Sequence, residues 1–108
     1  MGAIRISSLS TEPVRFAVSA VVNGNPYNPT QDAIQFAFMP LGRPPAASDW
    51  VNGAWVTVNG PPVQYVAECM VGPANNAVLL GLGMYVVWIK ITDAPSVPVR
   101  DVGTVQVF

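Results

Sequence analysis

The chain contains no histidine and only one cysteine, Cys69. Without histidine it lacks the commonest general base and the commonest metal ligand, and it cannot form a Ser-His or Cys-His nucleophile pair. One cysteine forms neither an internal disulfide nor a cysteine-based structural zinc site. We therefore expect no metal, no cofactor and no catalytic residues of these kinds, and the absence of a disulfide suits folding in a reducing cytoplasm.

Charged residues are also scarce. They make up 10% of the sequence, against about 25% in a typical soluble domain. The five basic residues are scattered, so no basic patch is present to bind nucleic acid. The six carboxylates are dispersed as well. A glycosidase needs only two carboxylates, which leaves a pair such as Glu68 and Asp101 open, although solvated groups in loops and at strand ends are the favoured interpretation.

Long hydrophobic runs are absent too. The longest apolar run, residues 77–89, is interrupted by glycine and is shorter than the about 20 residues that cross a membrane as a helix. The N-terminal residues lack a long apolar run and a following cleavage site, so no signal peptide is expected, and Ile6 stands where a myristoylation signal has serine or threonine. Nevertheless, 51% of the residues are apolar. A chain this apolar, this poor in charge and not placed in a membrane is expected to cover much of its surface with other protein chains.

Short segments with alternating apolar residues follow one another along the sequence. Eleven prolines and nine glycines separate these segments, and none has a sustained helical period. Alternation with period two predicts strands. The expected strands cover residues 3–6, 13–22, 34–39, 55–58, 63–71, 85–92 and 99–108. Their number and the turn signals between them predict one all-β domain, residues 1–108, folded as an antiparallel β-sandwich of about seven strands.

Two aromatic residues refine this prediction. Tyr85 follows Gly83 at the start of a long apolar strand, a position typical of the tyrosine corner of immunoglobulin-like sandwiches. Trp55 is the candidate core tryptophan. The sequence therefore predicts an immunoglobulin-like strand topology.

Cys69 falls on the apolar alternation beside Glu68, whose charge raises the pKa of the thiol, so we expect a buried, unreactive cysteine.

Two of the predicted strands are apolar on both faces. The strand at 13–22 carries Ala17 and Val21 on its second face, and the strand at 85–92 carries Val86 and Trp88. Because the outer face of a sandwich is normally polar, we expect a further layer over these strands, supplied by another molecule. Residues 40–49 form a predicted irregular loop stiffened by its prolines, and we expect this loop to contact a partner as well. The residues expected to contact a partner are Trp50, Val86, Trp88, Pro44 and Pro45.

A series of short motifs runs along nearly the whole chain. They are ISSLSTE at 6–12, NPT at 28–30, IQFAF at 34–38, DW at 49–50, AW at 54–55, VGP at 71–73 and GMYVVWIKITD at 83–93, followed by a prolyl loop at 95–98 and a last strand at 103–107. In this order the motifs resemble those of the small immunoglobulin-like virion proteins of tailed bacteriophages. The resemblance implies a non-enzymatic structural protein of the virion, made and assembled in the cytoplasm of the bacterial host.

The resemblance also implies the partners. They would be other virion proteins at the capsid surface, the head–tail connection or the tail, with this chain present as a homo-oligomer or in several copies, and neither nucleic acid nor membrane would be bound. The residues leave one alternative open, a carbohydrate-binding β-sandwich module used for host attachment. In that alternative Trp50, Trp55 and Trp88 would stack on sugar rings, although tryptophan more often serves in cores and protein interfaces.

Overall fold

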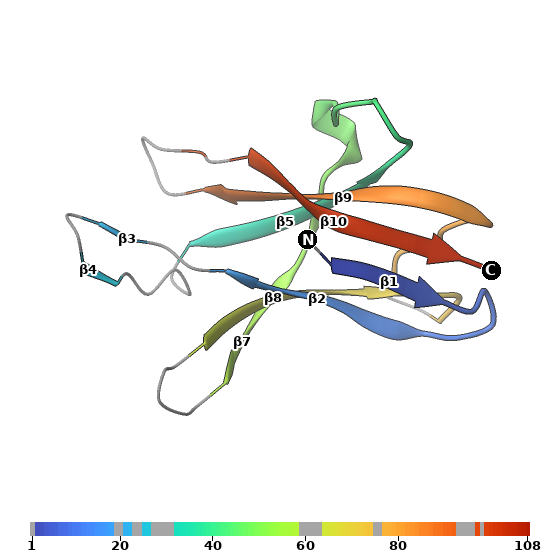
Figure 1. The fold of residues 1–108 in the computed structure, drawn as a ribbon, viewed down its shortest axis with the longest axis horizontal. Coiled ribbons are helices and arrows are strands. Elements are labelled where there is room, and N and C mark those ends of the chain that lie inside the picture. Colours follow the sequence, from blue (N-terminus) through green and yellow to red (C-terminus); the bar gives the residue numbers. More distant parts are fainter. Residues whose placement is uncertain are drawn as a thin grey trace.

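The computed structural model describes residues 2–18, 21–22, 25–26, 32–58, 64–74, 77–92, 97 and 99–108. Within these residues the chain forms ten strands and one short 3-10 helix, Ala47–Asp49. Figure 1 shows two sheets packed face to face, with the N- and C-terminal strands side by side. None of the described segments is a helix long and apolar enough to cross a membrane.

The two sheets share the strands unequally. The larger sheet has the order β1-β10-β9-β5-β6 and the smaller has the order β2-β8-β7. The strands of the larger sheet are β1 (Gly2–Ile6), β10 (Val99–Val107), β9 (Gly83–Thr92), β5 (Ala33–Met39) and β6 (Val51–Asn52). Those of the smaller sheet are β2 (Glu12–Val18), β8 (Gln64–Val71) and β7 (Ala54–Val58), and β3 (Val21–Val22) pairs with β4 (Asn25–Pro26) in a separate ribbon.

The predicted all-β sandwich is confirmed. Seven of the described strands have five residues or more, and each of them overlaps one of the predicted strands. Residues 19, 20 and 63 of the predicted strands lie outside the described residues, as do the side chain of Val21 and the motif at 28–30. The predicted strand at 13–22 is described as two strands, β2 and β3.

One strand pair departs from the predicted antiparallel arrangement. Strands β1 and β10 run parallel, with Gly2 opposite Gly103 and Ile6 opposite Val107. Beyond the last pair, the Phe108 N–H donates to the carbonyl of Ile6 over 3.0 Å. A period of two in the sequence reports which side chains share a face, but it carries no information on strand direction.

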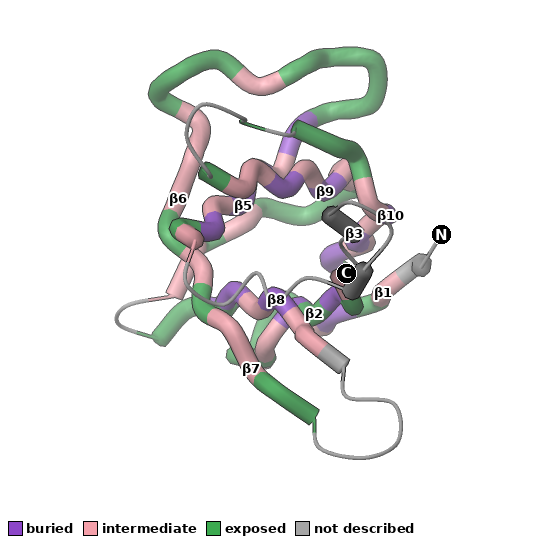
Figure 2. The backbone as a smooth tube through the Cα atoms, turned by 90° about the vertical axis from the view of Figure 1, so that its left-hand side faces the viewer, coloured by how far each residue is buried: buried purple, intermediate pink, exposed green. Residues whose placement is uncertain are grey.

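The core lies between the two sheets, where side chains from every second position meet. Figure 2 shows buried stretches on strands of both sheets. The buried cluster consists of Ile6, Val14, Phe16, Ile34, Phe36, Ala67, Cys69, Val71, Val87, Ile89, Val105 and Val107. Trp55 is half-buried, packs against this cluster and donates its Nε1 hydrogen to the carbonyl of Asp32 over 2.9 Å, which fits its predicted place in the core.

A tyrosine hydroxyl forms a hydrogen bond to the backbone of the connection between β8 and β9. The hydroxyl of Tyr85 donates to the carbonyl of Gly81 over 2.9 Å, four residues upstream. This is the contact expected of the predicted tyrosine corner. The half-buried ring of Tyr85 also packs against the core, so the hydrogen bond joins the start of β9 to the residues that lead into it.

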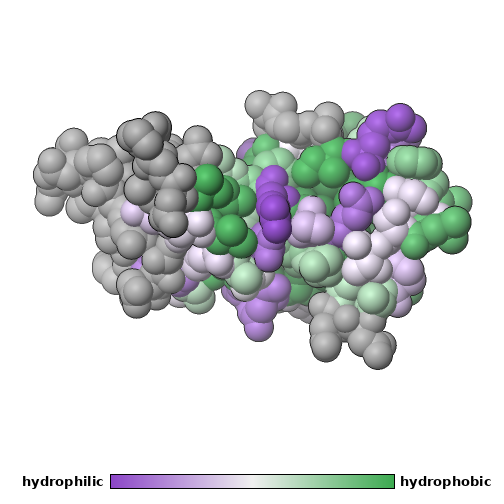
Figure 3. Space-filling model, turned by 90° about the horizontal axis from the view of Figure 1, so that it is seen from below, coloured by the Kyte–Doolittle hydropathy of each residue, from purple (hydrophilic) through white to green (hydrophobic). Residues whose placement is uncertain are grey.

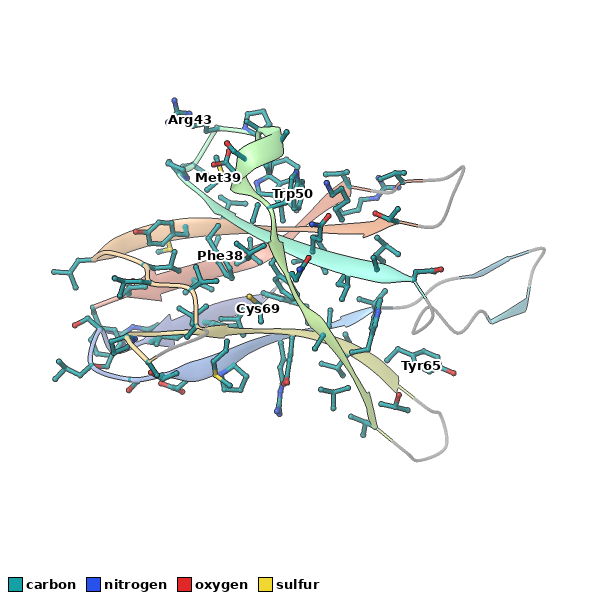
Figure 4. The ribbon with its side chains drawn as sticks, turned by 180° about the vertical axis from the view of Figure 1, so that it is seen from behind. Phe38, Met39, Arg43, Trp50, Tyr65 and Cys69 are labelled. Carbon is teal, nitrogen blue, oxygen red and sulfur yellow. The ribbon has the colours of Figure 1, made fainter. Side chains whose placement is uncertain are left out.

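The outer face of the larger sheet is partly covered by the chain itself. Ala37 and Met39 alternate with the inward-facing Phe36 and Phe38, yet they are only 0% and 7% exposed. Figure 1 shows the segment that contains the 3-10 helix lying above β5 and β9, and Figure 4 shows Met39 and Trp50 between that segment and the sheet. Residues 40–50 therefore fold back over part of this face. A further layer over Val86 and Trp88, supplied by another molecule, stays a prediction.

Candidate functional site

A hollow of about 350 Å³ lies on the outer face of the larger sheet. Val86 and Trp88 of β9 form its floor, since Tyr85, Val87 and Ile89 point to the core. The segment after β5 and one residue of β10 form its sides, and the complete lining is Leu41, Gly42, Arg43, Pro44, Val86, Trp88 and Asp101. The volume is near the lower end of the range of about 300–1,000 Å³ that is usual for binding sites.

The shape of the loop beside the hollow is set by local hydrogen bonds. The Arg43 N–H donates to the carbonyl of Pro40 over 3.2 Å, and Gly42 has a φ of 81°, in the left-handed region that suits glycine. Further along, the Asp49 carboxylate accepts from the Ala46 N–H over 2.8 Å. The turn at residues 40–43 leaves Leu41 85% exposed at the rim of the hollow.

Opposite charges flank the apolar floor. Arg43 follows β5 on one side of β9, and Asp101 of β10 lies on the other side, opposite Trp88 in the strand register. Both side chains belong to exposed residues, and neither forms an ion pair with any residue that the structure describes. The Trp88 Nε1 hydrogen is buried and has no acceptor among the described residues. A buried donor without an acceptor costs about 1–3 kcal/mol.

Three of the five predicted contact residues meet at this hollow. They are Pro44, Val86 and Trp88. Trp50 lies on the same outer face, where the Lys90 ammonium is 4.7 Å from the centre of its ring, and Pro45 is half-buried next to the hollow lining. Leu41 and Arg43 belong to the loop at 40–49, which the sequence also predicts as a contact. Asp101 was missed, because a single dispersed charge gives no periodic signal.

A second apolar surface lies at one end of the sandwich. The strand registers bring together the end of β1, the start of β9 and the end of β10, the right-hand end in Figure 1. Five large apolar side chains, 51–88% exposed, are carried there by the β1–β2 turn, the β8–β9 connection, the start of β9 and the C-terminal residue: Leu9, Leu79, Leu82, Met84 and Phe108. We call this surface the apolar end. The sequence prediction missed it because its leucines lie in connections outside the alternating strands.

The outer face of the smaller sheet is mixed in character. Figure 3, the view from below, shows strongly hydrophilic atoms with hydrophobic ones beside them on this face. Arg15 of β2 and Glu68 of β8 form an ion pair there, with 2.7 Å between Nε and Oε2. Val58 and Met70 remain 46% and 41% exposed.

The candidate carboxylate pair does not come together. Glu68 lies on the outer face of the smaller sheet, whereas Asp101 lies at the hollow on the outer face of the larger sheet. Both sheets and the core separate the two side chains, while the carboxylates of a glycosidase are about 5–9.5 Å apart. Within the part of the chain that the structure describes, no three histidine, cysteine, aspartate or glutamate side chains are grouped to hold a metal ion.

Cys69 is buried as predicted, with 4% of its surface exposed. Burial, and to a smaller extent the charge of Glu68, raises the pKa of the thiol to about 11. At pH 8 the folded thiol should react with an aromatic disulfide reagent at least about 100-fold more slowly than the thiol of the unfolded chain, since each pKa unit lowers the thiolate fraction about tenfold. Absorbance measurements with and without denaturant test this expectation, and equal rates would contradict it.

The described surface therefore offers a hollow with an apolar floor and two charged sides, an apolar end and a mixed outer face. Each is suited to contact with another molecule, because large apolar side chains are exposed at all three. Comparison of the chain with known protein families, with curated proteins and with solved structures finds no match.

Proposed function

We propose that this chain is a non-enzymatic structural subunit of a tailed-bacteriophage virion, which acts by packing against other protein chains in several copies. The observation that carries the proposal is the apolar end, where five large side chains are more than half exposed. Large apolar side chains exposed together at one end of a domain favour a protein contact there. The low share of charged residues, 10%, agrees with a surface that is covered in an assembly.

We further propose that the strand topology is immunoglobulin-like. Along the chain, β2, β8 and β7 take the places of strands B, E and D, while β10, β9 and β5 take those of G, F and C. The Tyr85–Gly81 hydrogen bond at the start of β9 is in the position of the tyrosine corner at the start of strand F. This correspondence supports the resemblance to immunoglobulin-like virion proteins, which carry such domains at the capsid surface, the head–tail connection or the tail.

A carbohydrate-binding module is the second candidate. It is favoured by Trp88, which lines the hollow together with the polar side chains of Arg43 and Asp101. The other two tryptophans fit it less well, since the Lys90 ammonium lies over the ring of Trp50 and Trp55 packs against the core. Titration of the tryptophan fluorescence with a panel of polysaccharides separates the two functions. Saturable quenching that disappears in a Trp88→Ala variant would favour sugar binding. A wild-type spectrum that no polysaccharide changes would exclude the carbohydrate-binding function.

The virion role is tested on purified particles of the phage that encodes the chain. Quantitative mass spectrometry of gradient-purified particles should find the chain at a constant ratio to the major capsid protein. That ratio should persist through washes in high salt, because apolar contacts are not screened by ions as charge contacts are. Absence of the chain from the particles would overturn the proposal.

A matched pair of variants assigns the contact to the apolar end. In particles assembled without the wild-type chain, a Leu79→Asp, Leu82→Asp double variant should be incorporated at least about tenfold less than wild type, since charges in an apolar contact must be desolvated. Thr92→Asp is the control, since Thr92 is exposed at the opposite end of β9 from the apolar end, and it should be incorporated normally. Normal incorporation of the double variant would exclude the apolar end as the contact.

A further inference from the structure

We infer that the hollow on the larger sheet is a two-fold interface between copies of this chain. In this interface Leu41 of each copy enters the hollow of the other, and Arg43 of each copy faces Asp101 of the partner subunit. The inference rests on the proposed multi-copy role and names one of its contacts. Both the apolar and the charged parts of the hollow support it.

The apolar part combines a protruding side chain with a recess. Leu41 is 85% exposed, although it sits directly beside a floor made of Val86 and Trp88. The side chain cannot fill the hollow of its own copy, because it forms the rim. A second copy turned by 180° brings its own Leu41 over the same floor. The hollow, about 350 Å³ in volume, has room for such a side chain.

The charged part determines which partner fits. In the sheet order, β9 lies between β10 and β5, so Asp101 and Arg43 are on opposite sides of the floor. Figure 4 shows Arg43 at the outer edge of the segment after β5, away from the core. A two-fold axis that lies in the plane of the interface and runs along β9 exchanges the two sides and places each Arg43 against the partner's Asp101. An interface of this symmetry is self-complementary, with both ion pairs formed at once.

Few other charges on this face would oppose such a contact, since Arg5 of β1, which also points outward, lies over the ring of Phe108. The outward residues of β9 and β10 near the floor are Met84, Val86, Thr104 and Gln106, all uncharged. Lys90, the next charge along β9, is engaged over the ring of Trp50. A second copy therefore meets an uncharged surface between two opposite charges. A partner of another kind would need the same two charges at the same spacing, which this chain already supplies.

The test uses charge reversal on the full chain, with the dissociation constant measured by sedimentation equilibrium. The wild-type chain should be a dimer, while Arg43→Asp and Asp101→Arg, each alone, should raise the dissociation constant about 100-fold or more, because each creates two like-charge pairs. An equimolar mixture of the two variants should associate again as a heterodimer. The double variant, with both charges exchanged in one chain, should also recover the dimer. Association in the mixture shows that the single variants are folded.

A second comparison tests the apolar part. Leu41→Ser should abolish the dimer, whereas Leu79→Ser at the apolar end should leave it unchanged. A wild-type chain that stays monomeric, or single variants that dimerise as wild type does, would overturn the inference. Neither result bears on the virion role, which depends on incorporation into particles. A chain that is monomeric in solution but present in particles would therefore exclude the two-fold interface alone.

Discussion

Replacing Phe36 with alanine is expected to lower the free energy of unfolding by about 3–5 kcal/mol. Phe36 is 0% exposed in β5, between β9 and β6 in the larger sheet. Its ring stacks on Phe38 with 6.2 Å between centroids, and the backbone of Gly53 lies so close that a Cβ there would be 2.6 Å from the ring. Neighbours held this tightly cannot collapse into the space, so the variant keeps a cavity.

Urea unfolding followed by circular dichroism measures this loss. A domain of this size has about 5–15 kcal/mol of stability, so the variant should also melt more than about 10 °C lower. Phe108→Ala is the matched control, because Phe108 is 51% exposed and its ring contacts the Arg5 guanidinium at 4.7 Å rather than the core. Its loss should be about 1 kcal/mol or less. Equal losses for the two variants would contradict the position assigned to Phe36.

Replacing Gly72 with alanine should cost about 2–5 kcal/mol, the sum of backbone strain and a steric clash. Gly72 has a φ of 146°, which side chains rarely tolerate. A Cβ at this position would collide with the carbonyl oxygen of Ser10 and with Thr11, in the turn between β1 and β2. Because this turn joins the two sheets, the clash would push apart the end of β8 and the strands of the N-terminus. Thermal melting measures the loss.

Gly42→Ala separates the two causes. Gly42 also has a positive φ, 81°, but no atom lies within 4 Å of the Cβ that alanine would add. This variant should therefore show only the backbone penalty of about 1–2 kcal/mol. If Gly72→Ala cost no more than Gly42→Ala, the close approach of the β1–β2 turn to the end of β8 would be ruled out.

Most of the strands could be predicted because their apolar residues alternate. In β9, Val87 and Ile89 face the core while Val86 and Trp88 face outward, as the period of two requires. The same pattern placed Cys69 in the core. The parallel pairing of β1 with β10 was not predictable in this way, because side-chain alternation is the same for a strand that runs in either direction.

Only some residues of the candidate site could be predicted from the sequence. Val86, Trp88 and Pro44 were predicted as contact residues because they are apolar or prolyl and lie outside the expected core. Arg43 and Asp101 are far apart in the chain, and only the neighbouring positions of β5, β9 and β10 bring them to one hollow. Leu41 gains its exposure from the turn that follows Pro40, which no periodic pattern describes.

The sequence by itself determined the class of the fold, the inward and outward faces of the strands and the shortage of charge, because each depends on residue type and local spacing alone. The tertiary structure decided which outer face stays open. Residues 40–50 fold back over part of the larger sheet and leave a hollow there, while the connections, the start of β9 and the C-terminal residue bring five exposed apolar side chains to one end. The physical reason is that surface exposure depends on contacts between segments distant in the chain, and alternation within one segment does not encode those contacts.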